Sequence, residues 1–215
     1  MTRILVFGAG TERGLWDFEG GWVHRLQQDL DEYSWSNNEN YSLYNLAVSD
    51  HTSEDILHRI KNETKARDAD EEIILLIRVT GHNDAQYHRD REQNRVTPTD
   101  YRQNISKIMD AAKKYATHEI VIGGTAIIES KVDPLPWKSQ YSIRPKDLEK
   151  YRKQRVEMCN ERKLDLIELR PYIDEQDWKK NKLRDGIHPN MSGHKTIYRI
   201  VKDGLKERNI IPEDA

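Results

Sequence analysis

The chain has 215 residues, of which 36% are hydrophobic and 33% are charged. This length suits one domain covering residues 1–215, and this composition excludes a disordered chain and one built around membrane spans. Its 35 basic and 37 acidic side chains leave a net charge of −2, so electrostatics favour neither nucleic acid nor an anionic membrane as a partner.

Short apolar runs rich in β-branched residues alternate along the chain with segments of helical periodicity. The predicted strands are Ile4–Phe7, Leu43–Val48, Ile73–Val79, Glu119–Gly123 and Leu164–Leu169. The predicted helices are Trp22–Leu30, Ser53–Lys65, Thr99–Tyr115, Lys146–Arg162 and Met191–Lys206. This alternation predicts a three-layer α/β fold, with helices on both faces of a parallel sheet and functional residues after the strands.

Capping residues and loops support these boundaries. Thr52 or Ser53 is expected to cap the second helix, with Asp55 in its first turn, and Thr97-Pro98-Thr99-Asp100 to open the third. The polar stretch Ser36–Asn40 and the proline-rich stretch Asp133–Pro145 are expected to be surface loops.

Three blocks at strand ends or before the last helix carry a family resemblance. They are Gly8–Gly14 after the first strand, Gly81-His82-Asn83-Asp84 after the third, and Asp185-Gly186-Ile187-His188 before the final helix. They resemble the Gly-Asp-Ser-x-x-x-Gly, Gly-x-Asn-Asp and Asp-x-x-His blocks of the SGNH (GDSL-like) esterase and lipase superfamily. The resemblance implies a flavodoxin-like three-layer fold with a five-stranded parallel sheet, and a small-molecule ester or acyl ligand without a cofactor.

The resemblance also assigns roles to residues. It makes His188 the general base and Asp185 its orienting carboxylate, and it places Gly10 where the family has its nucleophilic serine. Asn45–Asp55 resembles the stretch that carries an oxyanion-hole glycine, and the alignment puts Asp50 at that position. The oxyanion hole is therefore expected at Gly10, Asp50 and Asn83, and the substrate-binding residues are expected to be Thr11, Gly81, Asp84 and Trp137.

Gly10 is the main departure from the family pattern. An ester hydrolase needs a nucleophile, a base, a carboxylate that orients the base, and donors for the oxyanion. Glycine has no side chain to attack with, so the ordinary serine mechanism is impossible at this position. A carboxylate at Asp50 is also expected to repel the negative charge that develops in the transition state.

Several ways of replacing the serine stay open. Thr11, Ser49 or Glu12 could supply a nucleophile, or His188 could activate a water directly. Alternatively the chain, either in its natural form or as an altered sequence, binds an ester or acyl ligand without turning it over. The intact trio of Asn83, Asp185 and His188 favours an active hydrolase.

Two other functions are less consistent with the spacing. Gly8–Gly14 could be a dinucleotide-binding loop, but its last glycine is one residue too far for Gly-x-Gly-x-x-Gly, and Asp50 is too distant for a ribose partner. The eight histidines show no recognised metal-ligand spacing, so no metal is predicted.

The compartment is predicted from two features. The one cysteine, Cys159, has no partner for a disulfide, and the chain begins with an apolar strand instead of a signal peptide. We expect a cytoplasmic protein. The sequence does not indicate an oligomeric state.

Overall fold

The structure, a computed structural model, describes residues 1–79 and 81–215. Its main sheet has five parallel strands in the order β2-β1-β3-β6-β8. These are β1 (Thr2–Phe7), β2 (Tyr41–Asn45), β3 (Glu72–Ile77), β6 (His118–Ile122) and β8 (Asp165–Ile167). This order is that of flavodoxin-like sheets, and it confirms the predicted fold class.

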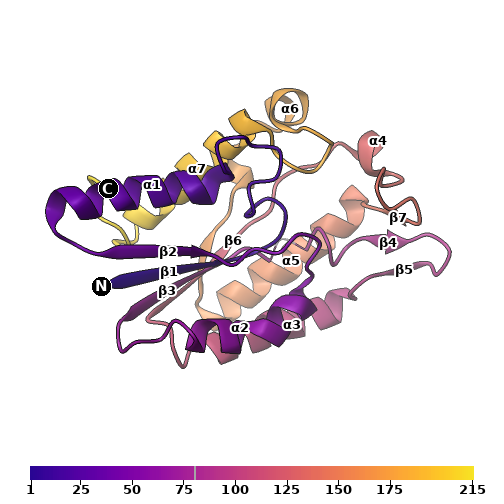
Figure 1. Ribbon diagram of the computed structural model, residues 1–215. Helices are drawn as coiled ribbons and strands as arrows, with labels where there is room; N and C mark the ends of the chain where they lie inside the picture. Colours follow the sequence, from indigo (N-terminus) through magenta and orange to yellow (C-terminus); the bar gives the residue numbers. More distant parts are fainter. Residues whose placement is uncertain (80) are drawn as a thin grey trace.

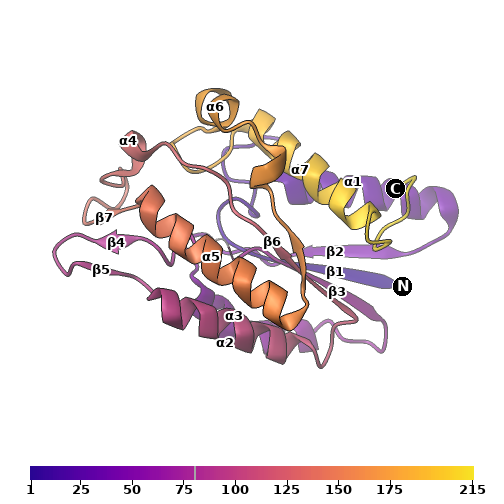
Figure 2. The same cartoon turned by 180° about the vertical axis from the view of Figure 1, so that it is seen from behind.

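Helices cover both faces of this sheet (Figures 1 and 2). One face carries α1 (Gly21–Asn37) and α7 (Met191–Lys206), and the other carries α2 (Ser53–Lys65), α3 (Pro98–Ala112) and α5 (Pro145–Arg162). Each face has its own buried core because successive strand residues point to opposite sides. In β1, for example, Ile4 belongs to the core under α1 and α7, and Leu5 belongs to the other.

Several short elements were not predicted. A second sheet joins β4 (Tyr87–His88), β5 (Gln93–Asn94) and β7 (Tyr141–Ser142) as antiparallel strands in the order β5-β4-β7. It lies beyond the carboxyl ends of the main strands (Figure 1). The remaining short elements are α4 (Glu129–Val132), a 3₁₀ turn (Arg170–Tyr172), α6 (Glu175–Asp177) and a π-helical turn (Trp178–Lys182). The predicted loop at 133–145 therefore contains a strand.

Some predicted boundaries were wrong by several residues. Helix α1 ends at Asn37 and not at Leu30, so it includes the start of the predicted loop Ser36–Asn40. The Ser34 hydroxyl and the Asn37 amide donate to the carbonyls of Leu30 and Tyr33, at 2.6 and 3.0 Å, which keeps these polar residues in the helix.

The other boundaries are closer to prediction. β2 ends at Asn45, three residues before the predicted end, and α3 ends at Ala112, three residues early. The remaining strand ends lie within two residues of the prediction, and α2 and α7 have the predicted bounds. Within residues 1–79 and 81–215 no helix is both long and apolar enough to cross a membrane.

The start of α2 is held by a capping box. The Thr52 side chain accepts from the amide of Asp55, and the Asp55 carboxylate accepts from the amide of Thr52 at 2.8 Å. This settles the cap as Thr52 and not Ser53. Thr97 caps α3 in the predicted way, through the amide of Asp100.

Candidate active site

A cavity of about 420 Å³ lies at the carboxyl ends of the main strands. Its wall includes all nine residues that the sequence assigned to the site: Gly10, Thr11, Asp50, Gly81, Asn83, Asp84, Trp137, Asp185 and His188. The segments that carry them follow β1, β2 and β3, precede β7, and precede α7. The structure thus brings the predicted residues together, as the rule for parallel α/β sheets requires. Their roles stay predictions.

The imidazole of His188 lies directly beside Gly10. A Cβ added at Gly10 would be 2.8 Å from Nε2 of His188 and 3.1 Å from its Cδ2. Real Cβ atoms do not come so close, so the ring partly occupies the space that a side chain at position 10 would need. His188, the predicted base, therefore faces position 10, the predicted nucleophile position, which has no side chain.

Asp185 is held by four donors. Its Oδ1 accepts from the backbone amides of Ile187 and His188, at 3.1 and 2.8 Å. Its Oδ2 is 2.8 Å from His188 Nδ1 and accepts from the Trp16 indole at 2.8 Å. Burial alone would raise the pKa of Asp185, but the hydrogen bonds and charge of His188, helped by Trp16, lower it overall. The ionised carboxylate favours a proton on Nδ1, which leaves Nε2 for the cavity.

Two half-exposed tryptophans flank this pair. The Trp137 ring lies 5.8 Å from the His188 ring, with 40° between the planes, and Trp16 lies beside Asp185. Both indoles line the cavity and are about half exposed. Trp22, the third tryptophan near the predicted functional side, is fully buried and packs in the core under α1.

Asn83 is positioned by hydrogen bonds at both ends of its side chain. Its Nδ2 donates to the carbonyl of His51 at 2.8 Å, and its Oδ1 accepts from Gln86 at 3.1 Å. An amide nitrogen has two hydrogens, and within the described residues the second one has no acceptor. This arrangement is compatible with the predicted oxyanion role.

Asp84 and Gly81 have evident structural roles. The Asp84 carboxylate is buried and accepts from the amide and hydroxyl of Ser53, so it holds the first turn of α2. Burial raises the pKa of Asp84 to about 6, although the Ser53 hydrogen bonds oppose the shift. Gly81 has a φ of +79°, and a Cβ there would be 2.7 Å from the Cβ of Tyr151.

Asp50 differs from the expectation. Its φ of +67° is of the kind that glycine adopts freely, which agrees with its alignment to the family glycine. Its carboxylate, however, pairs with Arg95 at 2.7 Å and with Lys138 at 2.6 Å. Burial would raise the pKa of Asp50, but Lys138 and Arg95 lower it overall. The expected repulsion of an oxyanion is therefore offset by two nearby cations.

The three proposed substitute nucleophiles lie in different environments. Glu12 is buried, and its carboxylate is 2.6 Å from Arg78, so it is committed to an ion pair. The Ser49 hydroxyl accepts from Arg13 at 3.2 Å. Thr11 and Ser49 line the cavity, but in the described part of the chain neither hydroxyl is hydrogen bonded to His188.

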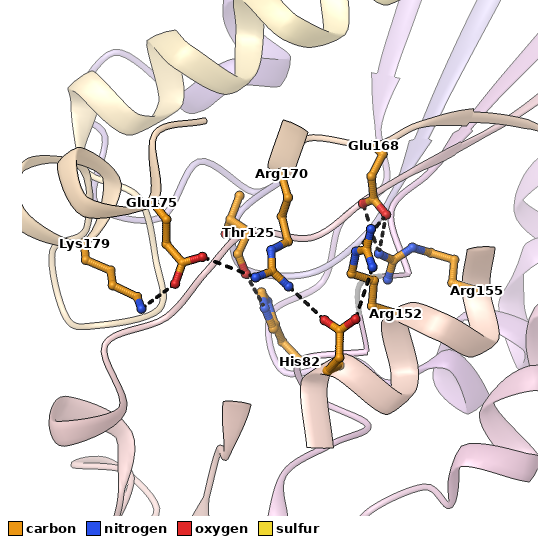
Figure 3. A network of polar contacts seen from close by, with 9 residues as sticks. His82, Thr125, Arg152, Arg155, Glu168, Arg170, Glu175 and Lys179 are labelled. Carbon is orange, nitrogen blue, oxygen red and sulfur yellow. Dashed lines mark hydrogen bonds and ion pairs between the residues drawn. The ribbon is translucent and has the colours of Figure 1, made fainter. Parts of the chain in front are cut away.

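A polar network behind the cavity was not visible in the sequence (Figure 3). His82 Nε2 lies 3.2 Å from the carbonyl of Thr125, and burial, with the charge of Arg78 nearby, lowers the pKa of His82 to about 3. Farther back, alternating acids and bases connect α5, the end of β8 and α6. The pairs that join α5 to Glu168 and Arg170 connect different elements, so no local spacing indicates them.

The other functions considered find little geometric support. The loop Gly8–Gly14 does not lead straight into a helix, since α1 begins only at Gly21, whereas a dinucleotide-binding loop opens onto a helix N-terminus. Among residues 1–79 and 81–215, no group of three or more His, Cys, Asp or Glu side chains could hold a metal ion. Cys159 is buried, and burial raises the pKa of its thiol to about 11.

Comparisons with known proteins agree with this geometry. The profile of the GDSL-like Lipase/Acylhydrolase family matches residues 5–196. Similar solved structures include a lipase/acylhydrolase from Enterococcus faecalis, with 20% identity, a TM-score of 0.69 and 97% of each chain covered. The psychrotrophic esterase EstA from Pseudoalteromonas sp. has 17% identity, a TM-score of 0.68, and coverage of 97% of this chain and 99% of that one.

An acetyl xylan esterase, AlAXEase, has 17% identity and a TM-score of 0.69, with 94% of this chain and 99% of that one covered. A search of the curated proteins gave no significant match. At these identities the structural likeness concerns the fold.

Proposed function

Because the chain belongs to the GDSL-like lipase/acylhydrolase family, we propose that it hydrolyses ester or acyl substrates by direct attack of a water molecule that His188 activates. The observation that carries this proposal is the placement of His188. Its Nδ1 is held by Asp185 while its Nε2 lies at a nucleophile position without a side chain. Because position 10 has no hydroxyl, we infer that His188 takes its proton from a water molecule.

The proposed reaction has two steps. Nε2 of His188 takes a proton from water as the water oxygen bonds to the carbonyl carbon, and the carbonyl oxygen becomes an oxyanion. The bond to the leaving alcohol then breaks, and His188 returns the proton to the departing alkoxide, which gives a carboxylic acid and an alcohol. Asp185 stabilises the imidazolium that exists between the steps.

Donors for the oxyanion are available near this position. Asn83 retains one amide hydrogen, and the backbone amides of Gly10 and Asp50 donate no hydrogen bond within the described residues. All three residues line the cavity. Arg95 and Lys138 offset the carboxylate of Asp50, so its charge is a smaller obstacle than the sequence alone suggested.

A second candidate function, ligand binding without turnover, is favoured by one observation. The His188 ring partly fills the space beside Gly10, so an attacking water must sit farther into the cavity than a serine oxygen would. In serine hydrolases, loss of the nucleophile lowers kcat by about 10⁶-fold. A cavity of this kind can bind an ester and leave it intact.

An ester hydrolysis assay separates these candidates. The panel is ethyl esters of short acids, aryl esters and acetylated sugars, the last chosen because one structural neighbour is an acetyl xylan esterase. We expect slow turnover that His188→Ala abolishes and Asp185→Asn reduces by about 10²- to 10⁴-fold. Circular dichroism and melting curves check that both variants fold.

Two further results bear on the mechanism. Mass spectrometry during turnover should find no acylated residue, and an adduct on Thr11 or Ser49 would contradict direct attack by water. A silent parent whose Gly10→Ser variant, alone or with Ala9→Asp, becomes active would favour ligand binding without turnover. Equal activity in the parent and His188→Ala would overturn the proposed function.

A further inference from the structure

We propose that Asp50 is a positioning residue: with Lys138 and Arg95 it forms an ionic latch that holds the Trp137 segment, residues 134–141, over His188. The latch limits how large a group can reach the imidazole. The statement about ligand size rests on the proposed function, whereas the latch itself is a property of the fold and can be tested without turnover.

The latch joins three segments that are distant in sequence. Asp50 lies between β2 and α2, Arg95 follows β5, and Lys138 precedes β7. The two oxygens of the Asp50 carboxylate are divided between the cations, with Oδ1 on Arg95 and Oδ2 on Lys138. One carboxylate therefore connects the rim of the main sheet to the region of the second sheet.

The two cations differ in how firmly they are held. The Arg95 amide donates to the Gln86 carbonyl at 2.9 Å, and Arg95 Nη1 also reaches the Gln86 side chain at 3.2 Å. Lys138 has its Nζ over the ring of Tyr141, a neighbour in its own segment. Arg95 is thus the fixed side of the latch, and Lys138 is the side that can move away.

The Trp137 segment is a small closed turn. The amides of Leu135 and Tyr141 donate to the carbonyls of Tyr141 and Lys138, each at 2.8 Å, and the Lys138 amide donates to Leu135 at 3.2 Å. Its far end is fixed to the second sheet, because the Gln140 carbonyl accepts from the Arg89 amide at 2.9 Å and Tyr141 pairs with His88. Lys138 and Trp137 are neighbours in the tip of this turn, so the contact of Lys138 with Asp50 restrains Trp137. The Trp137 ring lies against the His188 ring, with the centroids 5.8 Å apart, so the latch restrains a side chain that borders the proposed base.

The backbone of Asp50 supports a specific use for its side chain. A φ of +67° is unstrained for glycine and is uncommon for residues with a Cβ, although Asp and Asn tolerate it best. The two ion pairs give the carboxylate a function that glycine could not supply. Because Asp50 is about half exposed, the pairs are screened by solvent, and the latch can open.

Hydrogen exchange measures the latch directly. The variants are Asp50→Gly, Asp50→Asn and Lys138→Met, and the matched control is Asp165→Asn. Asp165 is a similarly exposed carboxylate that pairs with Arg208 at the opposite end of the sheet. We expect amides in residues 134–141 to exchange about two- to fivefold faster in the three latch variants, the range expected for one solvent-screened ion pair. The control should match the parent.

A double variant gives a sharper test of the contact between Asp50 and Lys138. In the Lys138→Met background, Asp50→Asn should add little further exchange, because contacting partners are not additive. Raising the salt to 1 M should speed exchange in the parent and leave Asp50→Gly nearly unchanged. Unchanged exchange in both Asp50 variants, or equal acceleration in Asp165→Asn, would overturn the latch.

A chemical probe tests the cover on His188. Diethyl pyrocarbonate carbethoxylates accessible imidazoles, and peptide mass spectrometry reports the rate for His188 separately from the other histidines. We expect this rate to rise severalfold in Asp50→Gly and to stay at the parent value in Asp165→Asn. An unchanged rate in Asp50→Gly would show that Trp137 stays in place without the latch. Neither readout requires turnover, so failure of the hydrolase proposal would leave this test intact.

Discussion

Asp84 and Asp185 line the same cavity, yet their pKa values shift in opposite directions. Both are affected by burial, which disfavours the charged form. Asp185 offsets burial through the hydrogen bonds and charge of His188, helped by Trp16, whereas at Asp84 the bonds from Ser53 and its own backbone and the charge of Arg95 do not outweigh burial. The number and charge of the donors therefore decide which carboxylate stays ionised.

The pKa of Asp84 predicts a pH dependence of stability. Folding raises this pKa from 3.8 to about 6, so the folded state binds the proton more tightly. The resulting stabilisation is fully present below pH 3.8 and is lost as the pH rises through about 6, and it amounts to about 3 kcal/mol. Asp84→Asn keeps an acceptor for Ser53 and cannot ionise.

Urea unfolding at pH 4.5 and pH 7 checks this prediction. The free energy of unfolding of the parent, measured relative to Asp84→Asn, should fall between the two pH values. Glu119, whose pKa burial raises to about 7, acts in the same direction but is present in both proteins, so the comparison isolates Asp84. An identical pH dependence in both proteins would show that Asp84 does not titrate in this range.

At the scale of elements, the turn after β1 is stabilised by a buried ion pair. The Glu12 carboxylate accepts from the amide of Ala9 at 2.9 Å and pairs with Arg78, which follows β3. Arg78 Nε also donates to the carbonyl of Gly123, after β6. The pair thus joins the ends of three neighbouring strands beneath Gly10.

The order and type of the main elements were predictable because their patterns are local. The central strands β1, β3 and β6 contain continuous apolar runs, and α2 and α3 carry capping residues at the expected positions. The end of α1 was missed because Ser34 and Asn37 resemble loop residues until their bonds to the preceding turn are seen. β4 and β7 have two residues each, too few for any periodicity.

The site was predictable only in part, for a related reason. The blocks containing Gly10, Asn83 and His188 are contiguous in sequence, so the resemblance located them. The bond from Trp16 to Asp185 spans 169 residues, and Asp50 and Lys138 are 88 residues apart. Contacts at such separations depend on the tertiary fold, so they cannot be predicted from composition or from local residue spacing.

Removing one member of the Glu12–Arg78 pair should be costly. Both side chains are 2% exposed, so Glu12→Gln leaves a buried guanidinium without its carboxylate. We expect a loss of about 3–5 kcal/mol in the free energy of unfolding. The double variant Glu12→Leu with Arg78→Met should lose less, because neither charge is then left alone. Urea unfolding compares the two, and a larger loss in the double variant would contradict this account.

At the scale of the whole molecule, the polar network of Figure 3 joins α5 to the segment that follows β8. Glu168, just after β8, pairs with Arg155 and Arg152 of α5, and its carboxylate lies so close to Gly123 that a Cβ there would be 1.9 Å from it. Gly123 therefore lies between Glu168 and Arg78. Glu168 and Arg155 join the end of β8 to α5 through a largely buried ion pair.

The burial of each ion pair in this network should determine how much it contributes to the free energy of unfolding. Arg155 is 1% exposed, so Glu168→Gln removes the carboxylate that pairs with a buried guanidinium, and we expect it to cost about 3–5 kcal/mol. Glu149 is 40% exposed and its partners Arg152 and Arg170 are 33% and 38% exposed, so Glu149→Gln should cost less than about 1 kcal/mol.

Urea unfolding of the two variants at pH 7 measures this difference. A domain of this size has a total stability of about 5–15 kcal/mol, so the larger loss is measurable and can unfold the protein outright. In that case the pair Glu168→Leu with Arg155→Met, which removes both charges, should restore folding. Equal costs for Glu168→Gln and Glu149→Gln would mean that solvent reaches Arg155, and that α5 is joined to the site by packing and not by charge.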